Sequence, residues 1–194
     1  MVKSSKNLVA IILLSGSFLA FCMSVTAQES GPPTTSQEQA MNQLNTVPKD
    51  FETEIIVADE KGRKRAEFLI EVYKSLASDP TIENVNKYVR DDYVQHSPML
   101  PDGPQGLAMF FRSSVVQYGT EIDVHRIIVV GNYAVAHVNF RKLTTSDPDD
   151  LGMSAVDIYT FGPDGKLAEH WDAVQGVPTY SVNPHGMFIR VLKD

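Results

Sequence analysis

The stretch VDIYTFGPDGKLAEHWDAVQ, residues 156–175, decides the fold. Its turn sequence GPDG lies between two runs with a period of two, residues 153–161 and 166–175, which is typical of a β-hairpin. Another pair of alternating runs, 120–130 and 133–143, is joined by the dipeptide Gly-Asn, a further hairpin signal. The sequence therefore predicts four consecutive antiparallel strands.

Helical spacing of apolar residues precedes these strands. It predicts one helix over residues 60–77, a short second helix that begins with Asp79 as its N-cap, and a third over 104–118 that Gly119 ends. Between the second and third helices, residues 91–106 are rich in proline and glycine and predict a loop. Helices followed by a strand meander indicate an α+β domain, with three helices packed on one face of a curved antiparallel sheet.

Alternation along the strands predicts which side chains share a face. His170 and Asp172 lie on the same face of the last strand, and Asp157 shares a face with Tyr159 on the strand before it. We assign His137, on the preceding strand, to the same side. A charge among apolar residues is costly to bury unless it is paired, so this face indicates the wall of a pocket rather than a solid core.

Each of these residues also has a purely structural interpretation. His170 could be a buried histidine that is hydrogen-bonded to Asp172 or to the main chain, and Asp157 could lie on a solvent-exposed face. Trp171, on the opposite face from His170, is expected to pack in the core or at a subunit contact. The combination of acids, imidazoles and aromatic rings favours a functional site.

The first 27 residues have the layout of a secretory signal peptide. A basic start is followed by an apolar run and by a small-x-small pattern at Val25 and Ala27, which predicts cleavage after Ala27 and export. An uncleaved anchor is the alternative, and a lipoprotein would use Cys22, although the bulky Phe21 precedes it.

The remaining chain divides into three parts. Residues 28–58 are rich in Gln, Ser, Thr and Pro and predict a disordered linker, residues 59–178 form the α+β domain, and residues 179–194 are a C-terminal extension.

Composition excludes several classes of function. The net charge is −7, and loss of Lys3 and Lys6 with the signal would leave 15 basic against 24 acidic residues, or about −9. The one basic run, KGRKR at 61–65, opens a helix and is expected to be a solvated face. We therefore expect no nucleic-acid partner, and no membrane contact after cleavage. Cys22, the only cysteine, would be lost too, so no disulfide is expected.

The motifs DDYVQHSP, before the third helix, and VDIYTFGPDGKLAEHWDAVQ resemble the SnoaL-like polyketide cyclase family of the nuclear transport factor two-like superfamily, over roughly residues 60–178. The resemblance implies a cone-shaped α+β fold around a deep pocket, in which an aspartate acts as general acid/base without metal or cofactor. That aspartate maps onto Asp172. The implied site comprises Asp172, His170 and Asp157 as catalytic residues, with substrate contacts from His96, Tyr159, His137, Phe110 and Tyr93.

Three functions follow as hypotheses. The chain could be a cofactor-free lyase or isomerase that acts on a small carbonyl compound with Asp172 as base. It could instead be a non-catalytic module that binds a small apolar ligand in the same pocket, or an exported interaction domain whose pocket is vestigial. A metal site formed by His96, His170 and Asp172 has no HxH or HExxH spacing, so no metal is expected. A homodimer is expected through an outer sheet face that carries Trp171 and Leu167.

Export is testable directly. The intact mass of the protein recovered from the cell envelope or medium should correspond to a chain that begins at Gln28, because cleavage follows Ala27. Recovery of a full-length chain from the cytosol alone would contradict the assignment.

Overall fold

The computed structural model describes residues 35–36, 51–183 and 185–190. The signal peptide and most of the predicted linker lie outside these residues. The elements of the described domain, in chain order, are β1 (Glu54–Val57), α2 (Glu60–Ser78), α3 (Ile82–Tyr88), β2 (Val89–Gln95), α4 (Pro104–Tyr118), β3 (Glu121–Val130), β4 (Tyr133–Arg141), β5 (Met153–Phe161) and β6 (Leu167–Gly176). The helices precede the β3–β6 meander, which confirms the predicted α+β class.

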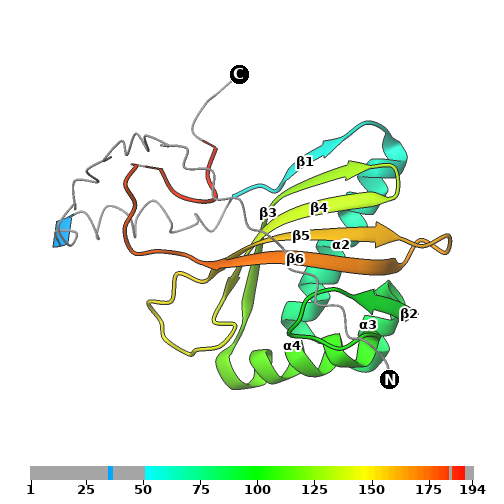
Figure 1. Ribbon diagram of the computed structural model, residues 1–194, viewed down its shortest axis with the longest axis horizontal. Coiled ribbons are helices and arrows are strands. Elements are labelled where there is room, and N and C mark those ends of the chain that lie inside the picture. Colours follow the sequence, from blue (N-terminus) through cyan, green and yellow to red (C-terminus); the bar gives the residue numbers. More distant parts are fainter. Residues whose placement is uncertain (1–34, 37–50, 184, 191–194) are drawn as a thin grey trace, which may run out of the picture. The chain divides into compact units, whose positions relative to one another are not determined.

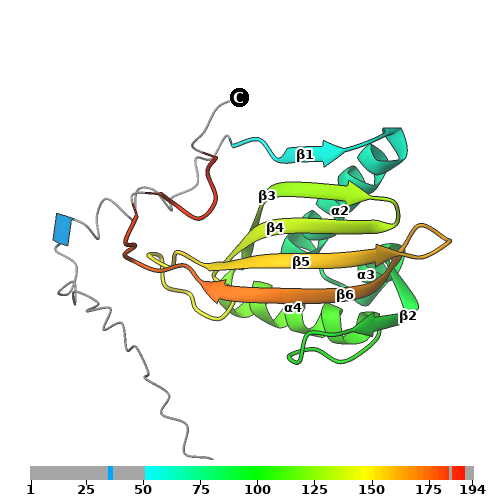
Figure 2. The same cartoon turned by 45° about the horizontal axis from the view of Figure 1, so that its top comes forward.

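The strands form one six-stranded sheet in the order β1-β3-β4-β5-β6-β2. Neighbours among β3, β4, β5 and β6 are antiparallel, whereas β1 pairs with β3 and β2 pairs with β6 in parallel. Figures 1 and 2 show that the sheet is curved and that helices α2, α3 and α4 lie on one of its faces. We call this the inner face and the opposite one the outer face. The hydrophobic core lies between the helices and the inner face.

Local signals set most of the helix ends. Asp59 caps α2, where its carboxylate accepts a hydrogen bond from Gly62 N at 2.7 Å. Gly119 ends α4 as predicted, with φ 73°, in the left-handed region that glycine enters without strain. The start of α3 was predicted wrongly: Thr81, not Asp79, is the N-cap, and its side chain accepts from Asn84 N.

Both predicted hairpins form. In the first, β3 and β4 are joined at Gly131, whose φ of 60° suits a tight turn with positive φ. In the second, residues 162–166 join β5 to β6.

A bulge near the start of β6 changes which side chains face inward. Phe161 pairs with Leu167 and Thr160 pairs with Glu169, so Ala168 is an extra residue on β6. Leu167 therefore faces the core, where it is 1% exposed, although alternation placed it on the outer face beside Trp171. The prediction that Leu167 contributes to an outer surface is wrong.

Two short strands occur where the sequence predicted irregular chain. The linker prediction is wrong for residues 54–57, which form β1, so the domain begins before residue 59. Likewise β2 occupies the first part of the predicted 91–106 loop. Both are edge strands with little apolar alternation, so periodicity alone did not reveal them.

The described part of the C-terminal extension packs on the outer face. Phe188 is 2% exposed and stacks on His125 with ring centroids 4.4 Å apart. The His125 ring also stacks on Phe51, with ring centroids 4.8 Å apart. Arg126 Nη2 donates a hydrogen bond to the carbonyl oxygen of Phe188 at 3.0 Å. The extension therefore covers part of β3 and belongs structurally to the domain.

Among the helices of the described ranges, none combines the length and the apolar character that a bilayer span requires.

The packing around His125 predicts a pH-dependent stability. Burial, followed by the nearby His137 and Arg126, lowers the pKa of His125 from 6.5 to about 4. Because the unfolded chain binds the proton more readily than the native one, the free energy of unfolding should fall between pH 6.5 and pH 4. The loss is at most roughly 3 kcal/mol.

Urea unfolding at several pH values measures this loss. His125→Phe keeps a ring in place and should flatten the pH dependence, whereas the exposed His185→Gln should leave it unchanged. Identical slopes for the wild type and His125→Phe would contradict the assignment.

Candidate active site

A cavity of about 450 Å³ lies between the helices and the inner face of the sheet. This is a normal volume for a small-molecule site. Its wall is mainly apolar and aromatic, and among the described residues that form it there is no lysine or arginine. The helices contribute Tyr73, Leu76, Leu107, Phe110 and Phe111, and the sheet contributes Phe140, Met153, Tyr159 and Val174. The cavity therefore suits a neutral, largely apolar molecule.

Three ionisable side chains project into this cavity from the neighbouring strands β5 and β6. Asp157 is paired directly with Asp172 across the two strands, and His170 is paired with Tyr159. One ligand atom from each of Asp157, His170 and Asp172 lies within 4.8 Å of the other two. The structure thus brings together the three residues that alternation placed on one face, and their catalytic roles stay predictions.

Asp157 is held by a chain of phenols. It is 2% exposed, and Tyr73, from α2, donates a hydrogen bond to its Oδ2 at 2.6 Å. The Tyr159 hydroxyl lies 3.1 Å from that of Tyr73. Burial raises the pKa of both phenols well above the usual value, and the charge of Asp157 raises them further. Both tyrosines therefore stay protonated, and Tyr73 is a permanent donor to Asp157.

The hydrogen bonds of His170 define its tautomer. Gln95 Oε1 accepts a hydrogen bond from Ser97 N at 2.9 Å, so this atom is the amide oxygen. It lies 2.8 Å from His170 Nδ1, which must therefore carry a proton. His170 Nε2 is buried, has no hydrogen-bond partner among the described residues, and lies 3.5 Å from Asp157 Oδ1. His170 Nε2 therefore faces the two carboxylates.

Asp172 differs from Asp157 in being unrestrained. It is partly exposed, and within the part of the chain that the structure describes its carboxylate makes no hydrogen bond of the kind that holds Asp157. It lines the cavity and is close enough to Tyr93 and Tyr159 to raise the pKa of each, behind the larger effects of burial and of Asp157. Asp172 is therefore the carboxylate that is available to a bound molecule.

The other predicted contacts divide into two groups. Tyr93, Phe110 and Tyr159 line the cavity, as expected for substrate contacts. His96 does not. Its ring stacks on Trp171, with centroids 4.4 Å apart and an interplanar angle of 5°, and its Nε2 lies 3.3 Å from Glu169 Oε2. Since Trp171 faces away from the cavity, His96 lies outside the site, and His96 does not join His170 and Asp172 there.

His137 also lies on the wrong face for a pocket residue. Its Nδ1 accepts a hydrogen bond from Arg126 at 2.8 Å, its Nε2 lies 3.0 Å from Ser154 Oγ, and its ring is 5.4 Å from that of Phe188. The inner face of β4 is instead formed by Ala134, Ala136, Val138 and Phe140. Alternation separates the two faces of β4 but does not say which one is inner. The prediction that the face with His137 is the inner one is wrong.

Two residues that shape the site were not predicted from the sequence. Tyr73 lies on the apolar face of the helix predicted over residues 60–77, and a buried tyrosine hydroxyl needs a hydrogen-bond partner, which signals a polar contact in the core. Gln95 had no sequence signal, because its role depends on the parallel pairing of β2 with β6, which places it opposite His170.

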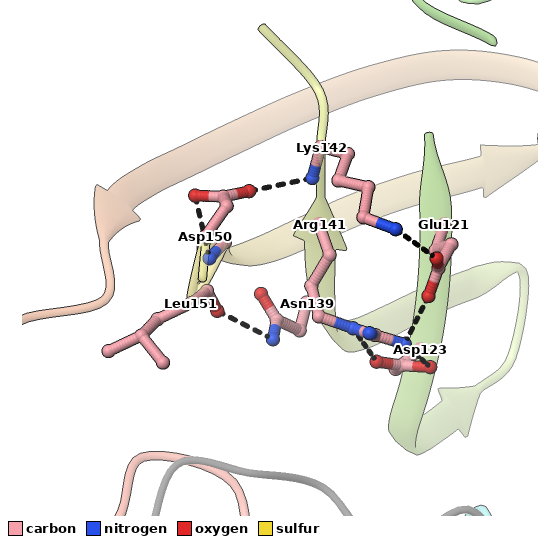
Figure 3. Close-up of polar contacts among 8 residues, drawn as sticks. Glu121, Asp123, Asn139, Arg141, Lys142, Asp150 and Leu151 are labelled. Carbon is pink, nitrogen blue, oxygen red and sulfur yellow. Dashed lines mark hydrogen bonds and ion pairs between the residues drawn. The ribbon is translucent and has the colours of Figure 1, made fainter. Parts of the chain in front are cut away.

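A polar network holds the loop that borders the cavity (Figure 3). Arg141 bridges Glu121 and Asp123, at 2.7 Å from each, and Lys142 Nζ reaches Glu121 at 2.8 Å. Asp150 accepts from Lys142 N at 2.7 Å, so both ends of the β4–β5 loop are held together. This loop supplies Leu143 and Thr144 to the wall of the cavity.

The sequence between residues 71 and 170 matches the model of the SnoaL-like domain family. The chain belongs to this family, which the sequence resemblance implied to be part of the nuclear transport factor two-like superfamily. No protein of curated function matches the chain closely enough to count as a relative.

Three solved structures are similar to this chain at low sequence identity. A proposed polyketide cyclase from Bacillus cereus is 17% identical and aligns over 66% of this chain and 90% of its own, with a TM-score of 0.53. A protein of this superfamily from Mesorhizobium loti, of unknown function, is 18% identical over 62% of this chain and 99% of its own (TM-score 0.49). A proposed SnoaL-like isomerase from Agrobacterium tumefaciens is 14% identical over 58% and 99% (TM-score 0.48). At 17% identity, the similarity to the Bacillus cereus structure supports the fold alone.

The bond between Tyr73 and Asp157 predicts a stability change. Tyr73→Phe removes the donor at 2.6 Å and leaves a buried carboxylate without it, which should lower the free energy of unfolding by about 1–3 kcal/mol. Tyr88→Phe is the matched control, because the described contact of Tyr88 is the packing of its ring on Phe68. This variant should change the free energy of unfolding by less than about 0.5 kcal/mol. Denaturant unfolding measures both, and equal effects would contradict this description of Asp157.

Proposed function

We propose that this protein is a cofactor-free lyase or isomerase that acts on a small, largely apolar carbonyl compound, with Asp172 as its general acid/base. One observation carries the proposal. Asp172, a carboxylate without a hydrogen bond in the described residues, lines an apolar cavity of about 450 Å³. Proton transfer next to a carbonyl needs a base positioned beside the substrate, and a carboxylate without a competing hydrogen bond can serve as that base.

The proposed reaction begins with proton abstraction. The Asp172 carboxylate takes a proton from the carbon next to the carbonyl, and the electron pair of that C–H bond moves to the carbonyl oxygen to form an enolate. In an isomerisation, Asp172 returns the proton to a different carbon. In an aldol-type closure, the enolate carbon attacks a second carbonyl, and the resulting alkoxide takes the proton back. Neither route consumes a cofactor.

A phenol group supports the enolate in this proposal. Tyr93 lines the same cavity, and burial raises the pKa of its phenol, so it remains a neutral O–H donor. The single proton of Tyr159 is already shared with the Tyr73 oxygen, because Tyr73 donates its own proton to Asp157. A preoriented donor in a cavity that excludes water stabilises a developing oxyanion more than it stabilises a neutral carbonyl oxygen. Asp157 and His170, which Tyr73 and Gln95 hold in place, would form a fixed part of the cavity wall beside Asp172.

A non-catalytic module that binds a small apolar ligand is the alternative. It uses the same cavity, and the predominance of apolar and aromatic residues in the wall supports it as well as it supports an enzyme. The two functions differ in what Asp172 contributes, because a binder does not need a base.

Export and self-association complete the proposal. Export rests on the sequence of residues 1–27, which lie outside the described residues. A homodimer through the outer face is supported by the partly exposed Trp171 and the exposed Ile128 and Val156. The C-terminal extension, packed beside them through Phe188, would border that contact.

The base assignment is testable without knowledge of the natural substrate. A panel of small cyclic ketones and diketones is incubated with the protein in deuterium oxide, and deuterium uptake next to the carbonyl is followed by NMR. Asp172→Asn should lower the exchange rate of any accepted ketone by about 10²–10⁴-fold. The exposed Asp91→Asn is the control and should exchange normally.

Equal exchange by the wild type and Asp172→Asn would contradict the assignment. Ligand binding that survives Asp172→Asn, with no exchange for any ketone, would favour the binding module.

A further inference from the structure

We infer that Asp157, His170 and Asp172 also form a binding site for one zinc-class divalent metal ion, which would occupy the carboxylate of Asp172. The inference goes beyond the proposed function, which needs no metal, and metal binding can be measured whether or not the protein is an enzyme.

The donor atoms have a spacing that suits such an ion. Zinc ligands at about 2.0–2.2 Å from the metal lie roughly 3.3 Å apart in a tetrahedral site. His170 Nε2 and Asp157 Oδ1 are already 3.5 Å apart. The third donor, from Asp172, is within 4.8 Å of both, and the absence of a hydrogen bond to it from the described residues leaves its side chain free to rotate inward. The cavity leaves room for a fourth ligand.

The strongest indication is the buried imidazole nitrogen. His170 is 6% exposed, yet its Nε2 has no hydrogen-bond partner in the described part of the chain. Gln95 Oε1, oriented by Ser97 N, accepts a hydrogen bond from His170 Nδ1 and so orients Nε2 toward the two carboxylates. A metal-binding histidine usually donates the N–H of its other ring nitrogen to an oxygen, which fixes the tautomer and the orientation of the ring.

Asp157 has equivalent support. Tyr73 donates to its Oδ2 at 2.6 Å, which leaves Oδ1 directed at His170 Nε2. Metal-binding carboxylates are themselves held by such hydrogen bonds to the oxygen that does not bind. Two of the three ligands are therefore oriented before any ion arrives.

Charge balance favours a cation at this position. Asp157 and Asp172 face each other across two strands in an apolar cavity, and no lysine or arginine is present among the described residues of its wall. Like charges directly opposite each other destabilise a sheet, and a bound cation removes that repulsion. One nitrogen and two carboxylate donors suit zinc and its first-row neighbours better than calcium, which takes six to eight oxygens.

Binding can be measured on the full purified protein after treatment with a chelator. We expect Zn²⁺ to bind with a stoichiometry of one in isothermal titration calorimetry, and Co²⁺ to give the visible d–d absorption of a low-coordinate site. Asp172→Asn and His170→Gln should each weaken binding by at least about tenfold, and Gln95→Leu, which removes the support of His170, by about 10–100-fold.

His96→Gln is the matched control. His96 also lies beside a carboxylate, Glu169, but outside the cavity, so its loss should leave affinity unchanged. Asp172→Asn preserves the side-chain shape at a residue that makes no hydrogen bond in the described part of the chain, so this variant should fold normally. It therefore tests the metal site even if His170→Gln does not fold. Absence of saturable Zn²⁺ binding, or binding that Asp172→Asn does not weaken, would overturn the inference.

The deuterium exchange assay separates the two proposals. Zn²⁺ that binds and slows exchange supports both. Exchange without Zn²⁺ binding overturns the metal site alone. Zn²⁺ that binds and accelerates exchange supports the metal site and overturns the role of free Asp172 as base.

Discussion

Two carboxylates that face each other inside an apolar cavity are the constraint on which the site depends. Asp157 and Asp172 are direct partners across β5 and β6. At an effective dielectric constant of about 20, two charges roughly 5 Å apart repel each other by about 3 kcal/mol. Tyr73 limits this cost by donating a hydrogen bond to Asp157, and Gln95 holds the ring of His170 beside the pair. A single proton, or a metal ion, relieves the remaining repulsion.

This constraint connects the fold to the proposed chemistry. The hairpin register makes the two carboxylates neighbours, and α2 and β2 supply the groups that hold Asp157 and His170. Asp172 alone of the three lacks such restraint in the described residues, so the site separates a fixed carboxylate from a reactive one.

Much of this arrangement could be predicted from the sequence, and the exceptions have physical causes. Period-two alternation, together with the turn residues, predicted both hairpins and brought His170 to the face of Asp172. It failed at Leu167, because an extra residue in β6 reverses the alternation locally. It also failed at His137, because alternation does not identify the inner face. The role of Gln95 depends on the pairing of two distant strands, which no local pattern encodes.

A double-mutant cycle tests the central constraint most directly. Unfolding free energies are measured at neutral pH for the wild type, Asp157→Asn, Asp172→Asn and the double variant. Because each carboxylate raises the cost of the other, Asp172→Asn should stabilise the wild type more than it stabilises the Asp157→Asn protein, with a coupling of at least about 0.5 kcal/mol. Effects that add to within about 0.3 kcal/mol would contradict the account, since the two carboxylates would then not share one electrostatic site.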